Sequence, residues 1–202
     1  MILGLVLAGG RSVRMGREKA FVPLAGRPLV AHVIARMAPQ VDTLVINANG
    51  DLARFDRFGL GILADWRDLG LEGPLAGVLA GLIHAEPRGA SHLATVPCDA
   101  PFLPRDLVRR LAAAAGPGEI ALAESEAGVE PVFGLWPMTA LPALLEAARS
   151  GEQSLRGAAA RAARVRRVRF IAAPGEPDPF LNLNRPEDLA SAEARLVAPG
   201  KI

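Results

Sequence analysis

The sequence predicts an α/β protein, a three-layer α/β/α sandwich built around a mostly parallel sheet. Short apolar runs typical of buried strands alternate along the chain with longer runs of helical character. The connections between them are short, and several helix-like segments open on proline, which suits the first position of a helix. Because the alternation continues without a linker or a repeat, we expect a single domain over residues 1–202.

The individual elements follow from this alternation. The predicted strands are Ile2–Leu7, Thr43–Asn47, Gly61–Ala64, His92–Val96 and Ile120–Ala123. Two further runs are expected to add to the sheet as antiparallel strands, namely Pro131–Leu135 and Val165–Ile171. The predicted helices are Pro28–Met37, Pro74–His84, Pro104–Ala114, Thr139–Arg149, Gln153–Ala163 and Pro186–Leu196.

The composition indicates a globular protein with a large apolar core. Half of the 202 residues are hydrophobic, and 23 basic residues against 21 acidic ones leave a formal net charge of +2. So small an excess does not indicate a nucleic-acid partner. The densest basic run, Arg161–Arg169, contains alanine and valine but no aromatic residue. This pattern favours a solvated helix end and strand over an RNA site.

Cys98 is the one cysteine of the chain, which excludes an internal disulfide and a cysteine-based zinc cluster and suits a reducing cytoplasm. The amino-terminal segment lacks the charged region and the long apolar stretch of a signal peptide. No apolar run approaches the roughly 20 residues that a membrane span needs. We therefore expect a cytoplasmic protein without a membrane partner.

The loop after the first predicted strand has the residue types that a nucleoside triphosphate site needs. It reads Leu7, Ala8, Gly9, Gly10 and continues with the cations Arg11, Arg14, Arg17 and Lys19. Glycines let main-chain N–H groups approach phosphate oxygens, and cations balance the phosphate charge. The spacing fits neither a Walker loop nor a dinucleotide fingerprint. The alternative is a tight turn with surface arginines.

Polar residues also follow the other predicted strands. Asn47 and Asn49 follow the second strand, Asp65 follows the third and Asp99 follows the fourth. Ligands of open parallel sheets bind beyond the carboxyl ends of the strands. Ordinary turns explain each of these residues alone, but the set indicates a nucleotide site. A second glycine-bearing loop, residues 72–77, either approaches a base closely or packs a helix tightly.

Asp99 is the predicted ligand for a Mg²⁺ cofactor. Pro97 and Pro101 restrict the backbone on both sides of it. Mg²⁺ binds proteins through one or two carboxylates, together with substrate phosphates and water. The alternative role of Asp99 is a helix cap or a turn. With the glycine loop beside it, we expect Asp99 to bind the metal, while Lys19 and Arg14 neutralise charge as pyrophosphate leaves. These three are the expected catalytic residues.

These motifs resemble a known family. The loop Leu7-Ala8-Gly9-Gly10-x3-Arg14-Met15-Gly16-x2-Lys19 is similar to the signature of nucleotidyltransferases with a Rossmann-like, glycosyltransferase-A-like fold. Within that group the chain resembles the molybdenum cofactor guanylyltransferases, the MobA type. The matching segments are Asn47-Ala48-Asn49, Asp65, Gly73-Pro74-Leu75-Ala76-Gly77, Pro97-Cys98-Asp99-x-Pro101 and Asn182-x-Asn184-x-Pro186-Glu187. They occur in order over nearly the full length.

The resemblance implies transfer of GMP from GTP to a molybdopterin that carries molybdenum, which gives a guanine dinucleotide and pyrophosphate. It implies that Leu7, Ala8, Gly9, Gly10 and Lys19 bind the nucleotide, as do Asn47, Asp65 and Asp99. It also implies that Asn182 and Asn184 bind the pterin. Residues 1–115 would then bind GTP and Mg²⁺, and residues 116–202 would contribute to molybdopterin binding. Other proteins of cofactor biosynthesis and client molybdoenzymes are implied as partners.

Two residues depart from the family pattern, since Glu18 stands where Asp is frequent and Arg185 stands where Thr is usual. Three alternatives stay open. A cytidylyltransferase for the same cofactor tends to have Ala where this chain has Gly9, which leaves more room for a purine. A sugar-phosphate nucleotidyltransferase would share the loop without needing Asn182 and Asn184. A non-catalytic pterin carrier would not need Lys19 or Asp99.

Overall fold

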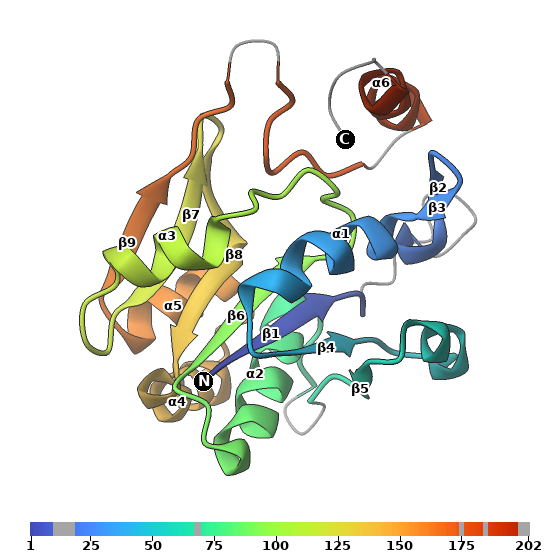
Figure 1. The fold of residues 1–202 in the computed structure, drawn as a ribbon. Helices are drawn as coiled ribbons and strands as arrows, with labels where there is room; N and C mark the ends of the chain where they lie inside the picture. Colours follow the sequence, from blue (N-terminus) through green and yellow to red (C-terminus); the bar gives the residue numbers. More distant parts are fainter. Residues whose placement is uncertain (10–18, 67–69, 174–175, 184–185, 198–202) are drawn as a thin grey trace.

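The computed structural model describes residues 1–9, 19–66, 70–173, 176–183 and 186–197 of the chain. A seven-stranded sheet in the order β5-β4-β1-β6-β8-β7-β9 forms its centre (Figure 1). The strands are β1 (Ile2–Leu7), β4 (Thr43–Asn47), β5 (Gly61–Leu63), β6 (His92–Pro97), β7 (Ile120–Ser125), β8 (Gly128–Pro137) and β9 (Val165–Arg169). Among these strands β8 pairs antiparallel with β6 and β7, and the other pairs are parallel.

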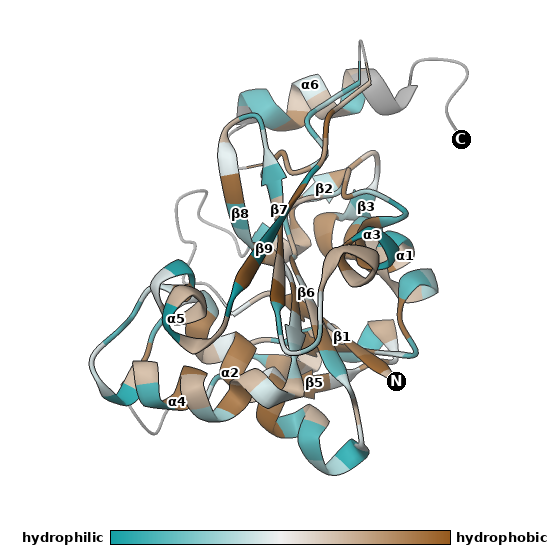
Figure 2. Cartoon of the chain, turned by 90° about the vertical axis from the view of Figure 1, so that its left-hand side faces the viewer, coloured by the Kyte–Doolittle hydropathy of each residue, from teal (hydrophilic) through white to brown (hydrophobic). Residues whose placement is uncertain are grey.

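Helices cover both faces of the sheet, which confirms the predicted three layers. They are α1 (Leu29–Met37), α2 (Pro74–Ala85), α3 (Leu107–Ala114), α4 (Leu141–Arg149), α5 (Leu155–Ala162) and α6 (Pro186–Val197). Figure 2 shows α1 and α3 on one side of the sheet and α2, α4 and α5 on the other. In the part of the chain that the structure describes, no helix is long and apolar enough to cross a membrane.

The core is divided between the two faces by the alternation of side chains along each strand. Leu3 and Leu5 of β1 belong to the cluster that includes α2, α4 and α5, whereas Val6 belongs to the cluster that includes α1 and α3. All three side chains are fully buried. A strand covered by helices on both faces must be apolar at nearly every position, which is why β1 reads as one continuous apolar run.

Two of the predicted elements differ from the structure. Val165–Ile171 was expected as an antiparallel strand, but β9 ends at Arg169 and pairs parallel with β7. β8 runs antiparallel to β7 and so returns the chain to the end at which β7 begins, and β9 starts from that end after α4 and α5. The helix predicted from Pro104 begins at Leu107 instead, and the residues before it form turns. The other predicted elements are present, with ends shifted by a few residues.

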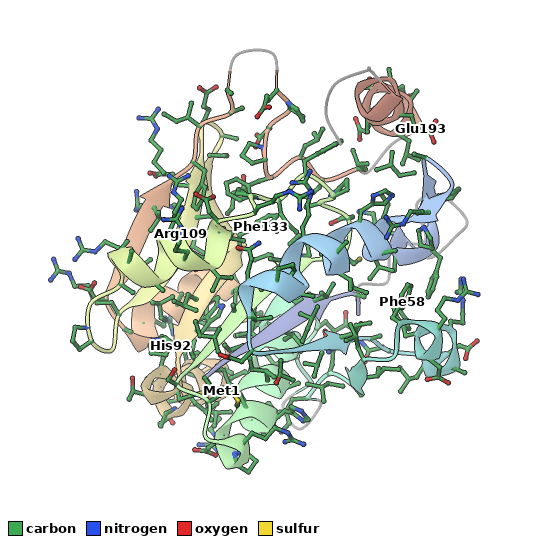
Figure 3. The ribbon with its side chains drawn as sticks, in the orientation of Figure 1. Met1, Phe58, His92, Arg109, Phe133 and Glu193 are labelled. Atoms are coloured by element: carbon green, nitrogen blue, oxygen red, sulfur yellow. The ribbon has the colours of Figure 1, made fainter. Side chains whose placement is uncertain are left out.

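A small antiparallel ribbon, which the sequence did not predict, lies between β1 and α1. Its strands are β2 (Pro23–Leu24) and β3 (Arg27–Pro28). Leu24 is buried in a separate apolar cluster with Leu183 and Ala192, so the ribbon packs against α6 and the segment before it. The backbone N–H of Ala25 donates to Glu193 Oε1 at 3.1 Å, and Glu193 is labelled on α6 in Figure 3. The carboxyl-terminal segment is thereby joined to the chain that follows Lys19.

The basic run Arg161–Arg169 forms the end of α5 and strand β9, as predicted. Arg164 and Arg166 form ion pairs with Glu119 at 3.4 Å and 3.2 Å. The backbone N–H of Gly116 donates to the same carboxylate at 2.9 Å. That hydrogen bond, followed by Arg166 and Arg164, holds the pKa of Glu119 below its ordinary value. The run therefore stabilises one edge of the sheet through local carboxylates.

His92 lies at the amino end of β6, where it pairs with Ile2 of β1. Figure 3 labels it together with Met1. Burial lowers the pKa of His92, and the positive amino terminus of the chain lowers it further. This end of the parallel strands is opposite to the end at which the polar residues gather.

Candidate functional site

The carboxyl ends of four neighbouring strands, β5, β4, β1 and β6, surround a cavity of about 220 Å³. The arrows of β1, β4 and β5 point to the same side of the molecule in Figure 1. The cavity is lined by Leu7, Ala8, Gly9, Lys19, Ala20, Asn47, Asp65, Gly73, Pro74, Pro97, Cys98, Asp99 and Val132. The residues that the sequence places after separate strands are therefore gathered at one site.

Strand register brings these residues to one level. Leu7 is paired with Asn47 on one side and with Pro97 on the other, and Asn47 is paired with Leu63. The ladder extends one residue into the loops, where Ala8 N–H donates to the carbonyl oxygen of Asn47 at 2.8 Å. Because parallel strands end at the same edge, the residue after each strand faces the same space.

A cluster of amides and one carboxylate forms the wall at β4 and β5. Asn47 Nδ2 donates to Asp65 Oδ1 at 2.8 Å and to the carbonyl oxygen of Leu63 at 3.2 Å. Asn49 Nδ2 donates to Asp65 Oδ2 at 2.6 Å, and Asn49 Oδ1 accepts the backbone N–H of Asp65 at 3.1 Å. Asn47 is 2 % exposed, so both of its amide hydrogens are used inside the protein. The two asparagines hold Asp65 in one orientation.

Two glycines allow the backbone to approach this cluster. A Cβ on Gly9 would lie 2.7 Å from Asn49 Nδ2 and 3.2 Å from an Asp65 carboxylate oxygen. A Cβ on Gly77 of α2 would lie 2.5 Å from Asn47 Oδ1 and 2.5 Å from a methyl group of Leu7. The second glycine loop thus packs α2 tightly against β4, while Gly73 and Pro74 line the cavity. The absence of a Cβ at Gly9 mainly leaves room for the side-chain amide of Asn49.

Lys19 and Asp99 meet at the opposite wall. Lys19 Nζ lies 3.2 Å from Asp99 Oδ2, and the two side chains are 18 % and 12 % exposed. Lys19 begins the 3₁₀ turn η1 (Lys19–Phe21), and Asp99 follows β6. A carboxylate taken out of water needs a charged partner or hydrogen-bond donors, and Lys19 supplies both. The pair brings one cation and one anion to the cavity within reach of the glycine loop.

The donor set around Asp99 fits a metal that arrives with its own ligands. Within the described ranges no group of three or more histidine, cysteine, aspartate or glutamate side chains could hold a metal ion. Mg²⁺ commonly takes one or two carboxylates from a protein and completes its octahedron with phosphate oxygens and water. Asp99 is suited to that role, whereas a resident metal bound by protein side chains alone has no ligand set in the described part of the chain.

The carboxyl-terminal segment contacts the loop that follows β6. The backbone N–H of Leu183 donates to the carbonyl oxygen of Asp99 at 3.0 Å, which places Asn182, a half-buried residue, next to the Asp99 loop. Three residues predicted to belong to the site, Gly10, Arg14 and Asn184, lie outside the described residues.

Two residues of the site, Asn49 and Val132, were not assigned a binding role from the sequence. Asn49 was noted only as part of a motif, yet it makes three hydrogen bonds to Asp65 and Gly9. The signal for it was its spacing, since residues two apart at the end of a strand can both turn toward one neighbour. Val132 of β8 lines the cavity as well. No local signal marks it, because it arrives through the antiparallel pairing of β8 with β6.

Comparison with known proteins agrees with this geometry. The family model of the MobA-like NTP transferase domain matches residues 4–166. A molybdenum cofactor guanylyltransferase of Cereibacter sphaeroides is 48% identical over 198 residues, which cover 96% of this chain and 97% of the relative. One of the same name from Bradyrhizobium sp. (strain ORS 278) is 47% identical over 202 residues, with 96% and 92% covered.

Solved structures show the same fold. The molybdopterin-guanine dinucleotide biosynthesis protein A of Archaeoglobus fulgidus superposes with a TM-score of 0.75 at 22% identity, covering 97% of this chain and 98% of that one. A nucleotidyl transferase from Methanothermobacter thermautotroptrophicus superposes with a TM-score of 0.75 at 17% identity, with 99% of both chains covered. At these identities the likeness concerns the fold, which is that of nucleotidyltransferases.

Proposed function

This chain belongs to the molybdenum cofactor guanylyltransferase family, and we propose that it transfers GMP from GTP to molybdopterin that carries molybdenum. The products are the guanine dinucleotide form of the cofactor and pyrophosphate. The observation that carries this proposal is the order of groups along the sheet edge. Asp65 and the asparagines lie at β5 and β4, the glycine loop follows β1, and the Lys19–Asp99 pair lies at β6.

This order corresponds to the order of groups in a nucleotide. The base lies against the amide and carboxylate wall, the sugar and the α-phosphate pass the glycine loop, and the outer phosphates meet Lys19. Leu7, Ala8 and Gly9 line the space between the two walls, which supports backbone contacts to the nucleotide. Gly10 continues the same loop in the sequence.

The Asp65 carboxylate supports guanine as the base. A carboxylate only accepts hydrogen bonds, and guanine presents two neighbouring donors, N1–H and the 2-amino group. Cytosine presents its 4-amino donor next to an acceptor nitrogen, which a carboxylate oxygen repels. Asn47, which holds Asp65 Oδ1, belongs to the same base pocket.

The transfer step uses charge and position rather than a strong base. The attacking group is the terminal phosphate of the pterin, which is already anionic near neutral pH. Lys19 and the loop cation Arg14 neutralise charge on the triphosphate as pyrophosphate leaves, and fixed charges of this kind stabilise a phosphoryl transition state. Asp99 would hold Mg²⁺, which would supply further positive charge to the phosphates. Placement of the reactants accounts for the remaining rate enhancement.

The second substrate approaches from the carboxyl-terminal part of the chain. Asn182 lies next to the Asp99 loop through the Leu183–Asp99 backbone hydrogen bond, and Asn184 follows two residues later. Residues 1–115 thus bind GTP and Mg²⁺, and residues 116–202 contribute to the pterin side. Proteins that deliver the pterin cofactor, and molybdoenzymes that receive the product, are the partners that this reaction requires. The single cysteine supports a cytoplasmic setting.

The test is nucleotide selectivity followed by turnover. With Mg²⁺ present, GTP should raise the melting temperature by a few degrees at saturation, while CTP and ATP should not. Molybdopterin carrying molybdenum should then release pyrophosphate from GTP. Asp99→Ala should remove this release and leave a folded protein. A preference for CTP would support the cytidylyltransferase alternative instead. Wild-type rates in Asp99→Ala would refute the role of Asp99.

A further inference from the structure

The side chain of Asn49 connects the base wall, formed by Asn47, Asn49 and Asp65, to the glycine loop that follows β1. Its amide nitrogen donates to Asp65 Oδ2 at 2.6 Å and to the carbonyl oxygen of Gly9 at 3.1 Å. Its Oδ1 accepts the backbone N–H of Asp65 at 3.1 Å. The reverse orientation of the amide would place its oxygen against two other acceptors, so these neighbours allow one orientation. Asn49 therefore fixes the direction of the Asp65 carboxylate relative to Gly9.

Asn47 holds the same carboxylate from a second side. Its amide donates to Asp65 Oδ1 at 2.8 Å, and Asn47 is nearly fully buried. Each oxygen of Asp65 thus accepts one side-chain amide hydrogen. Since each carboxylate oxygen has two lone pairs, one acceptor position remains on each oxygen. Asp65 lines the cavity, where those positions are available to a ligand with two adjacent donors.

We propose that Asn49 is a positioning residue that makes the pocket selective for guanine by holding both Asp65 oxygens in place. The proposal rests on the proposed function. Without the 2.6 Å bond from Asn49, Oδ2 is no longer oriented, although Asn47 still holds Oδ1. The carboxylate then accepts one base donor well but not two at once.

Inosine triphosphate separates this role from a general structural one. Its base keeps N1–H and lacks the 2-amino group, so it engages one oxygen of Asp65 where guanine engages both. If Asn49 only supported the loop, its loss would weaken the binding of all nucleotides by the same factor. If Asn49 orients the second oxygen of Asp65, its loss weakens GTP binding much more than the binding of inosine triphosphate.

The experiment measures Kd by calorimetry for GTP, inosine triphosphate and CTP with Mg²⁺, in the wild type and in three variants. Asn49→Ala removes the amide, and Asn49→Leu keeps nearly its size while removing both donors without adding a charge beside Asp65. Asp51→Ala is the matched control, because Asp51 is exposed on the same loop and caps the following turn without a side-chain hydrogen bond. Thermal unfolding without nucleotide establishes which variants are folded.

The wild type and Asp51→Ala should bind GTP at least about tenfold more tightly than inosine triphosphate. That factor is the contribution of one hydrogen bond from the 2-amino group of guanine to the charged Asp65. In the Asn49 variants GTP binding should fall about tenfold or more, inosine triphosphate binding should change less than about threefold, and the two should become nearly equal. A wild-type ratio in a folded Asn49 variant overturns the role of Asn49. A wild-type protein that prefers CTP contradicts the proposed function itself, before the variants are compared.

Discussion

Replacement of Gly9 by alanine tests whether the glycine loop and the base wall are coupled through Asn49 in nucleotide binding. Gly9 does not adopt a left-handed φ, so alanine there costs no backbone strain and acts only through its Cβ. That carbon would lie 2.7 Å from Asn49 Nδ2. To regain an ordinary contact distance the amide must retreat by roughly 0.7 Å, which is enough to break its 3.1 Å bond to the Gly9 carbonyl and to stretch its bond to Asp65.

The expected magnitude follows from these bonds. A hydrogen bond to a charged group contributes about 1.5–3 kcal/mol, so weakening the bond from Asn49 to Asp65 should reduce GTP affinity by about 10- to 100-fold. At a fixed saturating GTP concentration, a tenfold weaker Kd removes about 1.4 kcal/mol of ligand stabilisation. For a chain of this size that is roughly 3–6 °C of the GTP-induced rise in melting temperature.

Calorimetry with GTP and CTP measures the loss directly, and a double-mutant cycle identifies its cause. If Gly9 acts through Asn49, the alanine at position 9 should cost little in an Asn49→Ala background, because the obstructed amide is already gone. Additive losses in the double variant would contradict this coupling. Wild-type GTP affinity in Gly9→Ala would refute the steric argument as a whole.

Three further predictions concern the rest of the chain. Lys19→Met should raise the Mn²⁺ affinity of the nucleotide-free protein, since Asp99 loses its ion-pair partner, and it should weaken GTP binding. A paramagnetic-resonance titration that shows no gain in Mn²⁺ affinity would contradict the role of the pair. The pKa of Glu119 is lowered on folding, so its contribution to stability is present above the unfolded value near 4.3 and is lost as the pH falls through the folded value. Melting curves should therefore show Glu119→Gln less stable than wild type at pH 7, with the difference shrinking below about pH 4; a constant difference would argue against it. Leu24→Ala should destabilise the protein by about 2–5 kcal/mol, because this fully buried side chain joins the ribbon to α6, and an unchanged denaturation midpoint would show that the cluster collapses around the loss.

The fold could be predicted wherever the local pattern and the tertiary environment agree. β1 and β4 have the predicted bounds because both are short, apolar and covered on both faces. The direction of β9 could not be deduced, since direction depends on the end of the sheet at which the preceding helices leave the chain. Its three arginines, Arg166, Arg167 and Arg169, fit either direction. The β2–β3 ribbon has two residues in each strand, too few for a periodic signal, and it is stabilised by α6 from the far end of the sequence.

The site divides in the same way. Asn47, Asp65 and Asp99 could be expected together because each follows a strand of one parallel sheet, and the rule for such sheets needs only the strand assignments. The sequence did not indicate which of them contacts a ligand and which supports another residue. Asn47 is nearly fully buried with its donors used by Leu63 and Asp65, a fact that depends on distances across two strands. Gly9 was predicted to leave room for a purine. The three atoms nearest to its missing Cβ belong to Asn49, Asn47 and Asp65, so these side chains border the space that Gly9 leaves.

In the proposed function, the sheet order separates the choice of base from the chemistry of transfer. The base wall is built on β5 and β4, the charged pair stands on η1 and after β6, and β1 lies between them. The glycine loop after β1 is the part that contacts the base wall directly, through the Gly9 carbonyl and the Asn49 amide. A substitution at the base wall should therefore change which nucleotide binds while leaving Lys19 and Asp99 in place. The proposed roles therefore predict that substitution of Gly9 or Asn49 changes the nucleotide preference without any change in Lys19 or Asp99.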